Sequence, residues 1–413
     1  MNNISTNSFQ ANGINYRPSN KPIVVICIDG SADEYLDVTA AHGRLKSLMQ
    51  MSKYGYRGMV RGALPSFTNV NNSSIVTGAS PAVHGICGNF FYDTAKDEEV
   101  MMNSSEYLRA ETLLAAAANA GRKVAVVTAK EKLRDILSHK LNGIAISAEK
   151  ANQAKMETHG IDDVEAKVGY PTPTIYSADA SLFVLRAGTA LIQQGLADFL
   201  YLSLTDYMQH TYAPDAAESL AFYEEMDKEI GKMLELGAVI GATADHGMNA
   251  KIKADGSPNV LFVEDMLEQQ FGTGFRVICP ITDPYVKHHG ALGSYVVVHV
   301  DDKSRIEEVK EWLSLQPGIT EVHDKQSAVR NLEQPEDRIG DLVVMSARDV
   351  VVGRRPQYHD LAALDGTLRS HGGRYEEMVP MVISHPLNSK YRIKAAGDPR
   401  NFDIFDFTVN GTH

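Results

Sequence analysis

PIVVICIDG, at Pro22–Gly30, is a run of mostly β-branched residues that ends in an aspartate and a glycine. Such a run is typically buried on both faces of a parallel sheet, so the segment predicts a central strand. Similar runs alternate with amphipathic segments along most of the chain. We predict further strands at 58–64, 124–128, 144–147, 199–204, 238–244 and 378–385, and helices at 43–54, 107–120, 177–194 and 214–236. This alternation predicts an α/β fold built on a doubly wound sheet.

The order of elements changes near residue 265. Short strands are predicted at 275–278, 294–300, 319–323 and 341–346, with one helix at 303–315. This order is typical of a small α+β unit inserted into a larger domain. We therefore predict a flexible N-terminal tail at 1–20, an α/β core at 21–264 and 366–413, and an inserted α+β cap domain at 265–365.

The composition argues against several classes of protein. With 413 residues, 44% hydrophobic and 22% charged, the chain has the composition of a globular protein with a large core. A net charge of −12 argues against a nucleic-acid surface. No apolar run approaches the ~20 residues of a membrane span, and the first 20 residues lack the apolar segment of a signal peptide. We expect a cytoplasmic protein with neither a nucleic acid nor a membrane as partner.

Reactive side chains follow the predicted strands at the points where the strands end. Ligands of open α/β sheets bind at the carboxyl ends of the strands, so these side chains should lie along one edge. Each has an ordinary explanation when taken alone: an aspartate after a strand commonly caps a helix or forms a turn, and Asp206 and His210 have the i,i+4 spacing of a surface pair. Their joint occurrence favours a functional site. The residues that follow strands are Asp29, Thr68, Lys130, Lys132, Asp206, His210, Asp245 and His246, and His371 joins them just before the late strand at 378–385.

The ligand types in this set favour transition-metal ions. Imidazole and carboxylate without thiolate suit zinc, or a similar ion such as Mn²⁺ or Fe²⁺, better than calcium or magnesium. The three cysteines, Cys27, Cys87 and Cys279, lack CxxC spacing and predict neither a disulfide framework nor a thiolate site. Three carboxylates, three imidazoles and one hydroxyl are too many for one tetrahedral ion and fit two.

Hydroxyls, amides and glycines crowd the segment Pro65–Asn89, PSFTNVNNSSIVTGASPAVHGICGN, where a core element would carry aliphatic residues. Thr68 follows a predicted strand and precedes three asparagines, which places it at the N-terminus of a helix. The unpaired N–H groups and the positive helix end would favour an alkoxide or a phosphoryl oxygen there. The alternative is that Thr68 or Asn69 only caps the helix.

Six motifs together resemble the alkaline phosphatase superfamily: D-G at Asp29, S-F-T-N at Thr68, T-G-x-x-P-x-x-H-G-I-x-x-N ending at Asn89, D-x-x-x-H at Asp206, D-H-G at Asp245 and H-G-G at His371. The chain is most similar to the nucleotide pyrophosphatase/phosphodiesterase branch, whose nucleophile is a threonine. Within that branch it most resembles the phosphonoacetate hydrolase family. The resemblance covers nearly the whole chain from residue 21 onward. It implies a mostly parallel sheet with helices on both faces.

The resemblance also implies roles for the motif residues. Thr68 would be the nucleophile, and Asn89 would donate a hydrogen bond to a phosphoryl oxygen. The branch lacks the phosphate-binding arginine of alkaline phosphatase; Arg374 lies close to His371 in the sequence but belongs to no motif. Two zinc ions are implied, one held by Asp29, Thr68, Asp245 and His246, and the other by Asp206, His210 and His371.

Two lysines bear on the substrate. Thr128 and Glu131 have the spacing of a capping box, which predicts a helix with Lys130 and Lys132 in its first turn. Cations there oppose the helix macrodipole, so the pair calls for an anion. The alternative is a pair of solvated lysines offset by Glu131 and Asp135. The resemblance implies that both lysines bind a carboxylate of the substrate.

These expectations define one hypothesis and its main alternative. The resemblance implies a di-zinc hydrolase that cleaves the P–C bond of a phosphonate substrate, phosphonoacetate, through a phosphothreonine at Thr68. The alternative is a di-zinc phosphodiesterase or nucleotide pyrophosphatase of the same superfamily, which would need an aromatic or apolar pocket and would not depend on Lys130. A phosphomutase is disfavoured because those enzymes more often use serine and manganese. A homodimer is kept as a candidate oligomeric state.

Overall fold

A computed structural model describes residues 7–282, 290–364 and 367–412 of the chain. Its central sheet has seven strands, in the order β4 (Tyr56–Arg61), β19 (Met378–Ile383), β10 (Val239–Thr243), β3 (Ile23–Cys27), β9 (Phe199–Ser203), β7 (Val124–Thr128) and β8 (Ile144–Ser147). The strands from β10 to β8 run parallel. Strand β19 runs antiparallel to both β10 and β4. The edge strand β4 therefore points the same way as the parallel strands.

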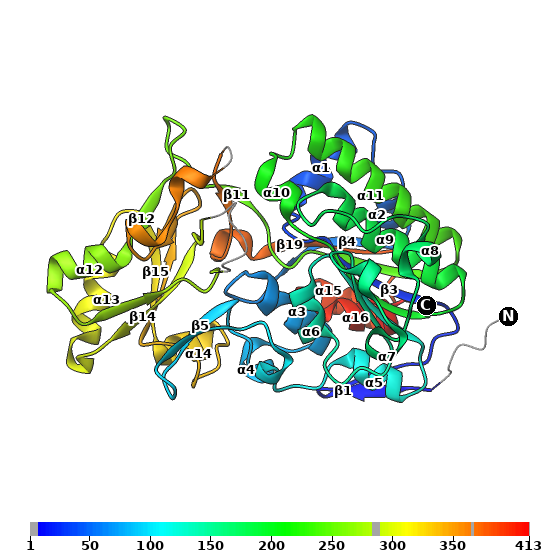
Figure 1. Ribbon diagram of the computed structural model, residues 1–413, viewed down its shortest axis with the longest axis horizontal. Helices are drawn as coiled ribbons and strands as arrows, with labels where there is room; N and C mark the ends of the chain where they lie inside the picture. Colours follow the sequence, from blue (N-terminus) through cyan, green and yellow to red (C-terminus); the bar gives the residue numbers. More distant parts are fainter. Residues whose placement is uncertain (1–6, 283–289, 365–366, 413) are drawn as a thin grey trace.

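Helices cover both faces of this sheet (Figure 1). All five residues of β3 are buried, and successive side chains point to opposite faces. Val24 and Ile26 pack against the upper layer in Figure 1, whereas Val25 and Cys27 pack against the lower one. This arrangement confirms the predicted fold. The upper layer contains α1 (Asp33–Ala41), α2 (Ser47–Tyr54), α9 (Ala178–Gln193) and α11 (Ala217–Glu235), and the lower one α3 (Thr68–Thr77), α5 (Leu113–Asn119), α6 (Glu131–Leu137), α15 (Ser389–Ala395) and α16 (Ile404–Asp406).

A second, antiparallel sheet of four strands lies on the left of Figure 1. Its apolar core includes Phe67 and Val70 at the start of α3, so this region packs directly against the segment that carries Thr68. Its bounds of 265–365 and its role as a cap stay predictions. The elements of this region are β13 (Phe275–Ile278), β14 (Tyr295–Val300), β16 (Leu342–Ser346) and β15 (Ile319–Asp324), with α12 (Val263–Phe271), α13 (Ile306–Ser314) and α14 (Lys325–Asn331).

The prediction of a flexible tail at 1–20 is wrong for the residues that the structure describes. Strands β1 (Phe9–Ala11) and β2 (Ile14–Tyr16) form an antiparallel hairpin. The rings of Phe9 and Tyr16 stack 4.8 Å apart, and Phe9 meets Phe199 of the main sheet edge-on. Only alternate residues of the hairpin carry these contacts, so a polar composition concealed them. Residues 1–6 of the predicted tail lie outside the described residues.

Local hydrogen bonds explain other departures from the predicted bounds. The helix predicted at 107–120 is limited to α5, because Thr112 Oγ1 accepts the N–H of Ala115 and starts the helix there. An unpredicted hairpin is formed by β5 (Phe90–Asp93) and β6 (Glu98–Met101). No helix in the described ranges is long and apolar enough to cross a bilayer. The remaining elements are α4 (Pro81–His84), α7 (Met156–His159), α8 (Val164–Val168), α10 (Tyr207–Thr211), β11 (Asn249–Ala250), β12 (Val260–Phe262), β17 (Val351–Gly353), β18 (Arg369–Ser370) and a π-helical turn at Phe407–Gly411.

Candidate active site

The carboxyl ends of the parallel strands meet at one edge of the main sheet, and the predicted site residues follow them. Asp29 comes after β3, Asp206 after β9 and Asp245 after β10, each within three residues of the strand end. Thr68 opens α3, which follows β4. Because β19 runs antiparallel to β10, its first residue lies at the same edge, and His371 shortly precedes it. Residues far apart in the sequence are thus brought together.

Thr68 is the first residue of α3, and Phe67 occupies the N-cap position. Because Phe67, and neither Thr68 nor Asn69, occupies the N-cap position, the interpretation of Thr68 or Asn69 as a simple cap does not hold. The Oγ1 atom of Thr68 lies 3.4 Å from Nε2 of His246. Its half-buried side chain lines a cavity of about 480 Å³. A hydroxyl at a helix N-terminus, beside an imidazole and open to a cavity, is placed to react with a ligand.

Each of the three predicted histidine ligands places Nδ1 against a backbone carbonyl oxygen. A carbonyl oxygen can only accept, so Nδ1 carries the proton of the neutral ring and Nε2 presents its lone pair. Metal-binding histidines are oriented in this way. The contacts are His210 to Arg369 at 2.8 Å, His246 to Gly247 at 2.9 Å and His371 to Ser66 at 2.8 Å.

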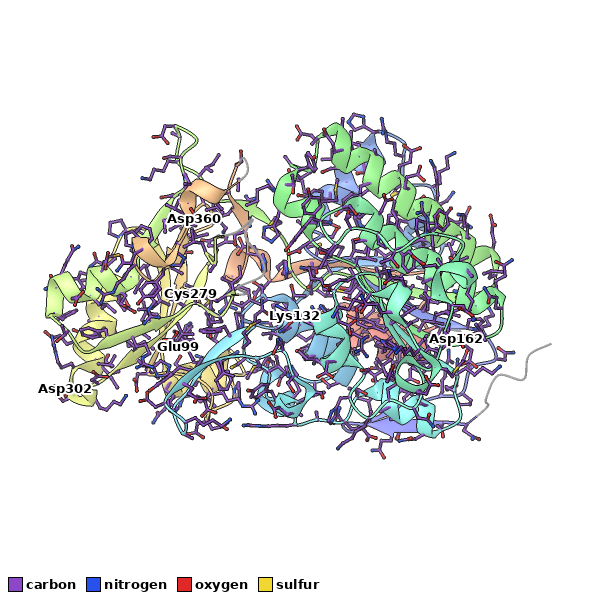
Figure 2. All side chains as sticks on the ribbon, viewed as in Figure 1. Glu99, Lys132, Asp162, Cys279, Asp302 and Asp360 are labelled. Carbon is purple, nitrogen blue, oxygen red and sulfur yellow. The ribbon has the colours of Figure 1, made fainter. Side chains whose placement is uncertain are left out.

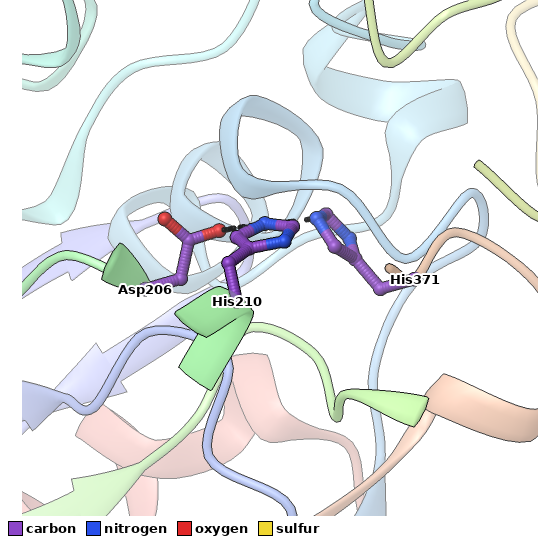
Figure 3. A group of neighbouring side chains, drawn as sticks. All are labelled: Asp206, His210 and His371. Atoms are coloured by element: carbon purple, nitrogen blue, oxygen red, sulfur yellow. Dashed lines mark ion pairs between the residues drawn. The ribbon is translucent and has the colours of Figure 1, made fainter. Parts of the chain in front are cut away.

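Carboxylate oxygens face these nitrogen atoms at short range. Nε2 of His210 lies 2.9 Å, and Nε2 of His371 3.9 Å, from Oδ2 of Asp206, and Figure 3 shows the three side chains converging. Nε2 of His246 lies 3.3 Å from Oδ1 of Asp29. Imidazole and carboxylate lone pairs repel one another unless a cation or a proton lies between them. The donor atoms therefore fit cations at two neighbouring positions, formed by Asp206, His210 and His371 and by Asp29, Asp206 and His246, each group within 4.8 Å.

This grouping of carboxylates and imidazoles differs in two respects from the ligand sets that the resemblance implies. Asp206 belongs to both groups, and Asp245 belongs to neither. The Oδ1 atom of Asp245 accepts the N–H groups of Gly30 and His246, each at 3.1 Å. Its Oδ2 atom accepts a hydrogen bond from Asn72 and lies 3.7 Å from Nε2 of His246. Because a carboxylate oxygen has two lone pairs, Asp245 stays a candidate ligand through Oδ2.

Burial disfavours the ionised form of the carboxylates at this edge unless a positive charge lies beside them. Asp29 is 1% exposed, and within the described ranges no group donates a hydrogen bond to its carboxylate. Burial, followed by the charges of Asp206 and Asp245, raises the pKa of Asp29 well above its usual value, and Lys130 lowers it in part. A buried carboxylate without donors calls for a positive partner.

The imidazole of His371 is held in its neutral form. Burial, followed by the neighbouring rings of His246 and His210, lowers the pKa of His371 well below its usual value. The rings of His371 and His246 stack with centroids 3.5 Å apart and planes 5° apart. A charged ring at His371 would be buried against a second imidazole, so the arrangement favours the neutral form of His371, which can ligate a metal.

The capping box predicted at Thr128 and Glu131 is wrong. Thr128 Oγ1 donates to the carbonyl of Lys130 at 2.8 Å. The N–H of Glu131 instead donates to Oε2 of Glu149 at 2.8 Å, so a side chain from the end of the neighbouring strand replaces the local cap. Lys130 is the N-cap residue of α6, and Lys132 lies in its first turn.

Both lysines line the same cavity as Thr68. Nζ of Lys130 lies 3.2 Å from Oδ1 of Asp206, and its side chain is 24% exposed. Lys132 lies near the middle of the molecule, between the two sheets (Figure 2). The lysines therefore place positive charge on the wall that faces the ligand-bearing edge.

Asn89 also lines the cavity. Its Oδ1 atom accepts the N–H of Asn69, the second residue of α3, at 3.3 Å. This contact leaves the amide nitrogen, which only donates, to face a ligand. The geometry is compatible with the predicted hydrogen bond from Asn89 to a phosphoryl oxygen.

The cavity contains residues that the sequence did not single out. They come from β6, from α6 and from loops that meet only in the folded chain. None of them belongs to a motif, so no local signal could have identified them. Polar lining is added by Asn103, Glu149 and Lys150, and apolar lining by Met101, Leu133, Ile175, Tyr176 and Ile281.

Arg374 is not among the residues that line this cavity. Its guanidinium donates to both carboxylate oxygens of Glu321 on β15, at 2.9 Å each, and to Glu377 at 2.9 Å. Hydrogen bonds from His323 and Arg374 lower the pKa of Glu321 to about 2. Arg374 therefore links the loop of His371 to the four-stranded sheet.

Residues 23–374 match the family described as type I phosphodiesterase / nucleotide pyrophosphatase. The chain belongs to this family. The crystal structure of phosphonoacetate hydrolase from Sinorhizobium meliloti 1021 in complex with phosphonoformate is 43% identical, covers 99% of this chain and 100% of that chain, and has a TM-score of 0.94. The structure in complex with phosphonoacetate gives the same values. Murine ectonucleotide pyrophosphatase / phosphodiesterase 5 is 15% identical over 95% of this chain and 96% of that chain, with a TM-score of 0.63, which shows a shared fold.

Membership in the type I phosphodiesterase / nucleotide pyrophosphatase family confirms the branch that the motifs indicated. The full-length similarity to the Sinorhizobium protein confirms the resemblance to phosphonoacetate hydrolase. The roles of the individual residues stay predictions, which the geometry above makes specific.

Proposed function

We propose that the chain is a di-zinc hydrolase that cleaves the P–C bond of phosphonoacetate to give acetate and phosphate. One observation carries the proposal: a single cavity is lined by the predicted nucleophile, by predicted metal ligands and by both lysines. The likeness to the Sinorhizobium phosphonoacetate hydrolase, whose structure contains phosphonoacetate, supports the substrate. The residues that meet there are Thr68, Asn89, Asp29, Asp206, His371, Lys130 and Lys132.

Zinc is the proposed metal, with Mn²⁺ and Fe²⁺ as alternatives. When bound, the two ions supply the positive charge that favours an ionised Thr68 hydroxyl and the charge developing on the phosphoryl oxygens. The formal charge of two zinc ions balances three aspartates and one threonine alkoxide. A substrate with both a phosphonate and a carboxylate then requires further cations, which the two lysines provide. The proposed ligands are Asp29, Thr68, Asp245 and His246 for one ion and Asp206, His210 and His371 for the other.

The proposed reaction has two steps. Oγ1 of Thr68 attacks phosphorus in line, the O–P bond forms, and the P–C bond breaks with its electron pair passing to carbon. That carbon is a poor leaving group unless its charge is delocalised into the carboxylate, where Lys130 and Lys132 stabilise it as it develops. The carbon takes a proton from water to give acetate. A water molecule then hydrolyses the phosphothreonine and restores Thr68, while Asn89 donates to a phosphoryl oxygen.

A zinc phosphodiesterase or nucleotide pyrophosphatase is the second candidate. The apolar lining by Met101, Leu133, Ile175 and Tyr176 favours it, because such an enzyme needs a surface for an aromatic leaving group. That function gives Lys130 and Lys132 no carboxylate to bind. A cytoplasmic location and a homodimer also stay predictions.

The test is the product balance of phosphonoacetate turnover by zinc-loaded protein. We expect acetate and phosphate in equal amounts, loss of both after chelation, and recovery when zinc is added back. Protein that releases no phosphate from phosphonoacetate, but does release nitrophenol from p-nitrophenyl phenylphosphonate, would establish the phosphodiesterase instead.

A further inference from the structure

Helix α3 buries polar side chains at positions where a core helix would carry aliphatic ones. Asn71, Asn72, Ser73, Ser74 and Thr77 are all 0% exposed. A buried amide is unfavourable unless its donors and acceptors are satisfied. The partners of each amide therefore indicate its role.

The side chain of Asn72 uses both of its donors and both of its acceptor positions. Nδ2 donates to the carbonyl of Thr68 at 3.0 Å and to Oδ2 of Asp245 at 3.3 Å. Oδ1 accepts the hydroxyls of Tyr201 at 2.7 Å and Ser203 at 2.8 Å. The reversed amide would place an oxygen against a carbonyl and a carboxylate, which can only accept, so one orientation is specified.

These four contacts join the parts of the site that must act together. Thr68 begins α3, Asp245 follows β10, and Tyr201 and Ser203 belong to β9, which leads to Asp206. Two further donors to Asp245, the backbone N–H groups of Gly30 and His246, both bind Oδ1. The amide of Asn72 instead donates to Oδ2, the oxygen that faces His246, and so orients it.

We propose that Asn72 is a positioning residue that fixes the carboxylate of Asp245 relative to Thr68, and so sets the coordination of the metal beside the nucleophile. The inference rests on the proposed function, because it takes Asp245 as a metal ligand. Tyr201 and Ser203 act one step further away by holding the amide of Asn72. Substitution of Asn72 should therefore lower the affinity for metal even in a protein that still folds.

The experiment compares wild type, Asn72→Asp and Ser73→Ala as Co²⁺-loaded proteins. Asn72→Asp keeps the shape of the side chain but replaces the donor to Thr68 and Asp245 with a second acceptor. Ser73→Ala is the matched control, because Ser73 lies next in the same helix and its buried Oγ has no hydrogen-bond partner within the described ranges. The measurements are Co²⁺ affinity by chelator competition, the visible spectrum of bound Co²⁺, and the unfolding temperature without metal.

We expect Asn72→Asp to weaken the binding of one Co²⁺ by at least tenfold and to change the visible spectrum, while Ser73→Ala matches wild type in both. If Asn72→Asp has the Co²⁺ affinity and spectrum of wild type and only a lower unfolding temperature, Asn72 has a structural role alone and the inference is overturned. Absence of Co²⁺ uptake by wild type would overturn the proposed function and the inference together.

A second variant covers the case in which Asn72→Asp fails to fold. Tyr201→Phe removes one of the two hydroxyls that hold the Asn72 amide and leaves Ser203 in place. The expected result is a severalfold loss of Co²⁺ affinity. Wild-type affinity in a folded Tyr201→Phe protein would contradict the inference.

Discussion

Two walls of the cavity are built in different ways. The side chains of the ligand wall, Asp29, Asp206 and His371, are at most 3% exposed. The two aspartates follow strands of the main sheet, and His371 follows β18 at the same edge. The lysine wall, made of Lys130 and Lys132, is half-buried and sits at the start of the short helix α6. The comparison shows that the candidate metal ligands are fixed by the central sheet, whereas the lysines come from a short helix that touches the ligand wall through Lys130 and Asp206.

Removal of the Thr68 hydroxyl should have the largest effect, because it leaves both walls intact but removes the proposed nucleophile. We expect Thr68→Ala to lower phosphonoacetate turnover by about 10⁴-fold or more. Thr68→Ser is the matched control and should retain measurable turnover, since a hydroxyl remains. Phosphonoacetate cleavage within tenfold of wild type by Thr68→Ala would show that Thr68 is not the nucleophile.

The contribution of the buried Lys251–Glu376 ion pair to the stability of the ligand wall can be tested at Lys251. Its Nζ donates to Glu376 at 2.8 Å and to the carbonyl of Arg348 at 2.7 Å, and the ion pair is fully buried. Oε2 of Glu376 in turn accepts the N–H of Gly373, two residues after His371, and the backbone carbonyl of Glu376 accepts the N–H of Gly247, next to His246. Lys251→Met leaves a buried charge without its partner, so we expect a loss of about 3–5 kcal/mol in the free energy of unfolding, measured with urea.

The double variant Lys251→Met, Glu376→Gln is the control for that measurement. It removes both charges and should recover part of the lost stability. A change below about 1 kcal/mol in Lys251→Met would mean that the buried pair does not stabilise the ligand wall.

Metal affinity should depend on pH through the ligand wall. The raised pKa of Asp29 means that this carboxyl keeps its proton at pH values where a free aspartate is ionised. An arriving cation must displace that proton, so affinity falls as pH falls through the raised pKa, by about tenfold per pH unit for one proton. The zinc dissociation constant between pH 8 and pH 5.5 measures this, and a constant value would contradict it.

The sequence predicted the main sheet and the edge at which the candidate site residues meet. Strands β7 and β8 have the predicted bounds, because buried parallel strands appear as continuous apolar runs. The start of α6 could not be predicted from local sequence, because the N–H of Glu131 donates to Glu149, which lies in the turn after β8. The contacts behind the proposed role of Asn72 were equally inaccessible from sequence, because its partners at 201, 203 and 245 lie far away in the chain. Local patterns predict elements and strand ends, whereas caps and supports that cross the fold require the structure.

The most direct test of the two-wall account is the activity of wild type and Lys130→Ala on two substrates. One is phosphonoacetate, which carries a carboxylate, and the other is p-nitrophenyl phenylphosphonate, which does not. We predict that Lys130→Ala loses about 10²-fold in kcat/KM for phosphonoacetate, as expected for a charged contact strengthened in the transition state, and keeps ester cleavage within a few-fold. Equal losses on both substrates, or no loss on phosphonoacetate, would contradict the assignment of carboxylate recognition to the lysine wall.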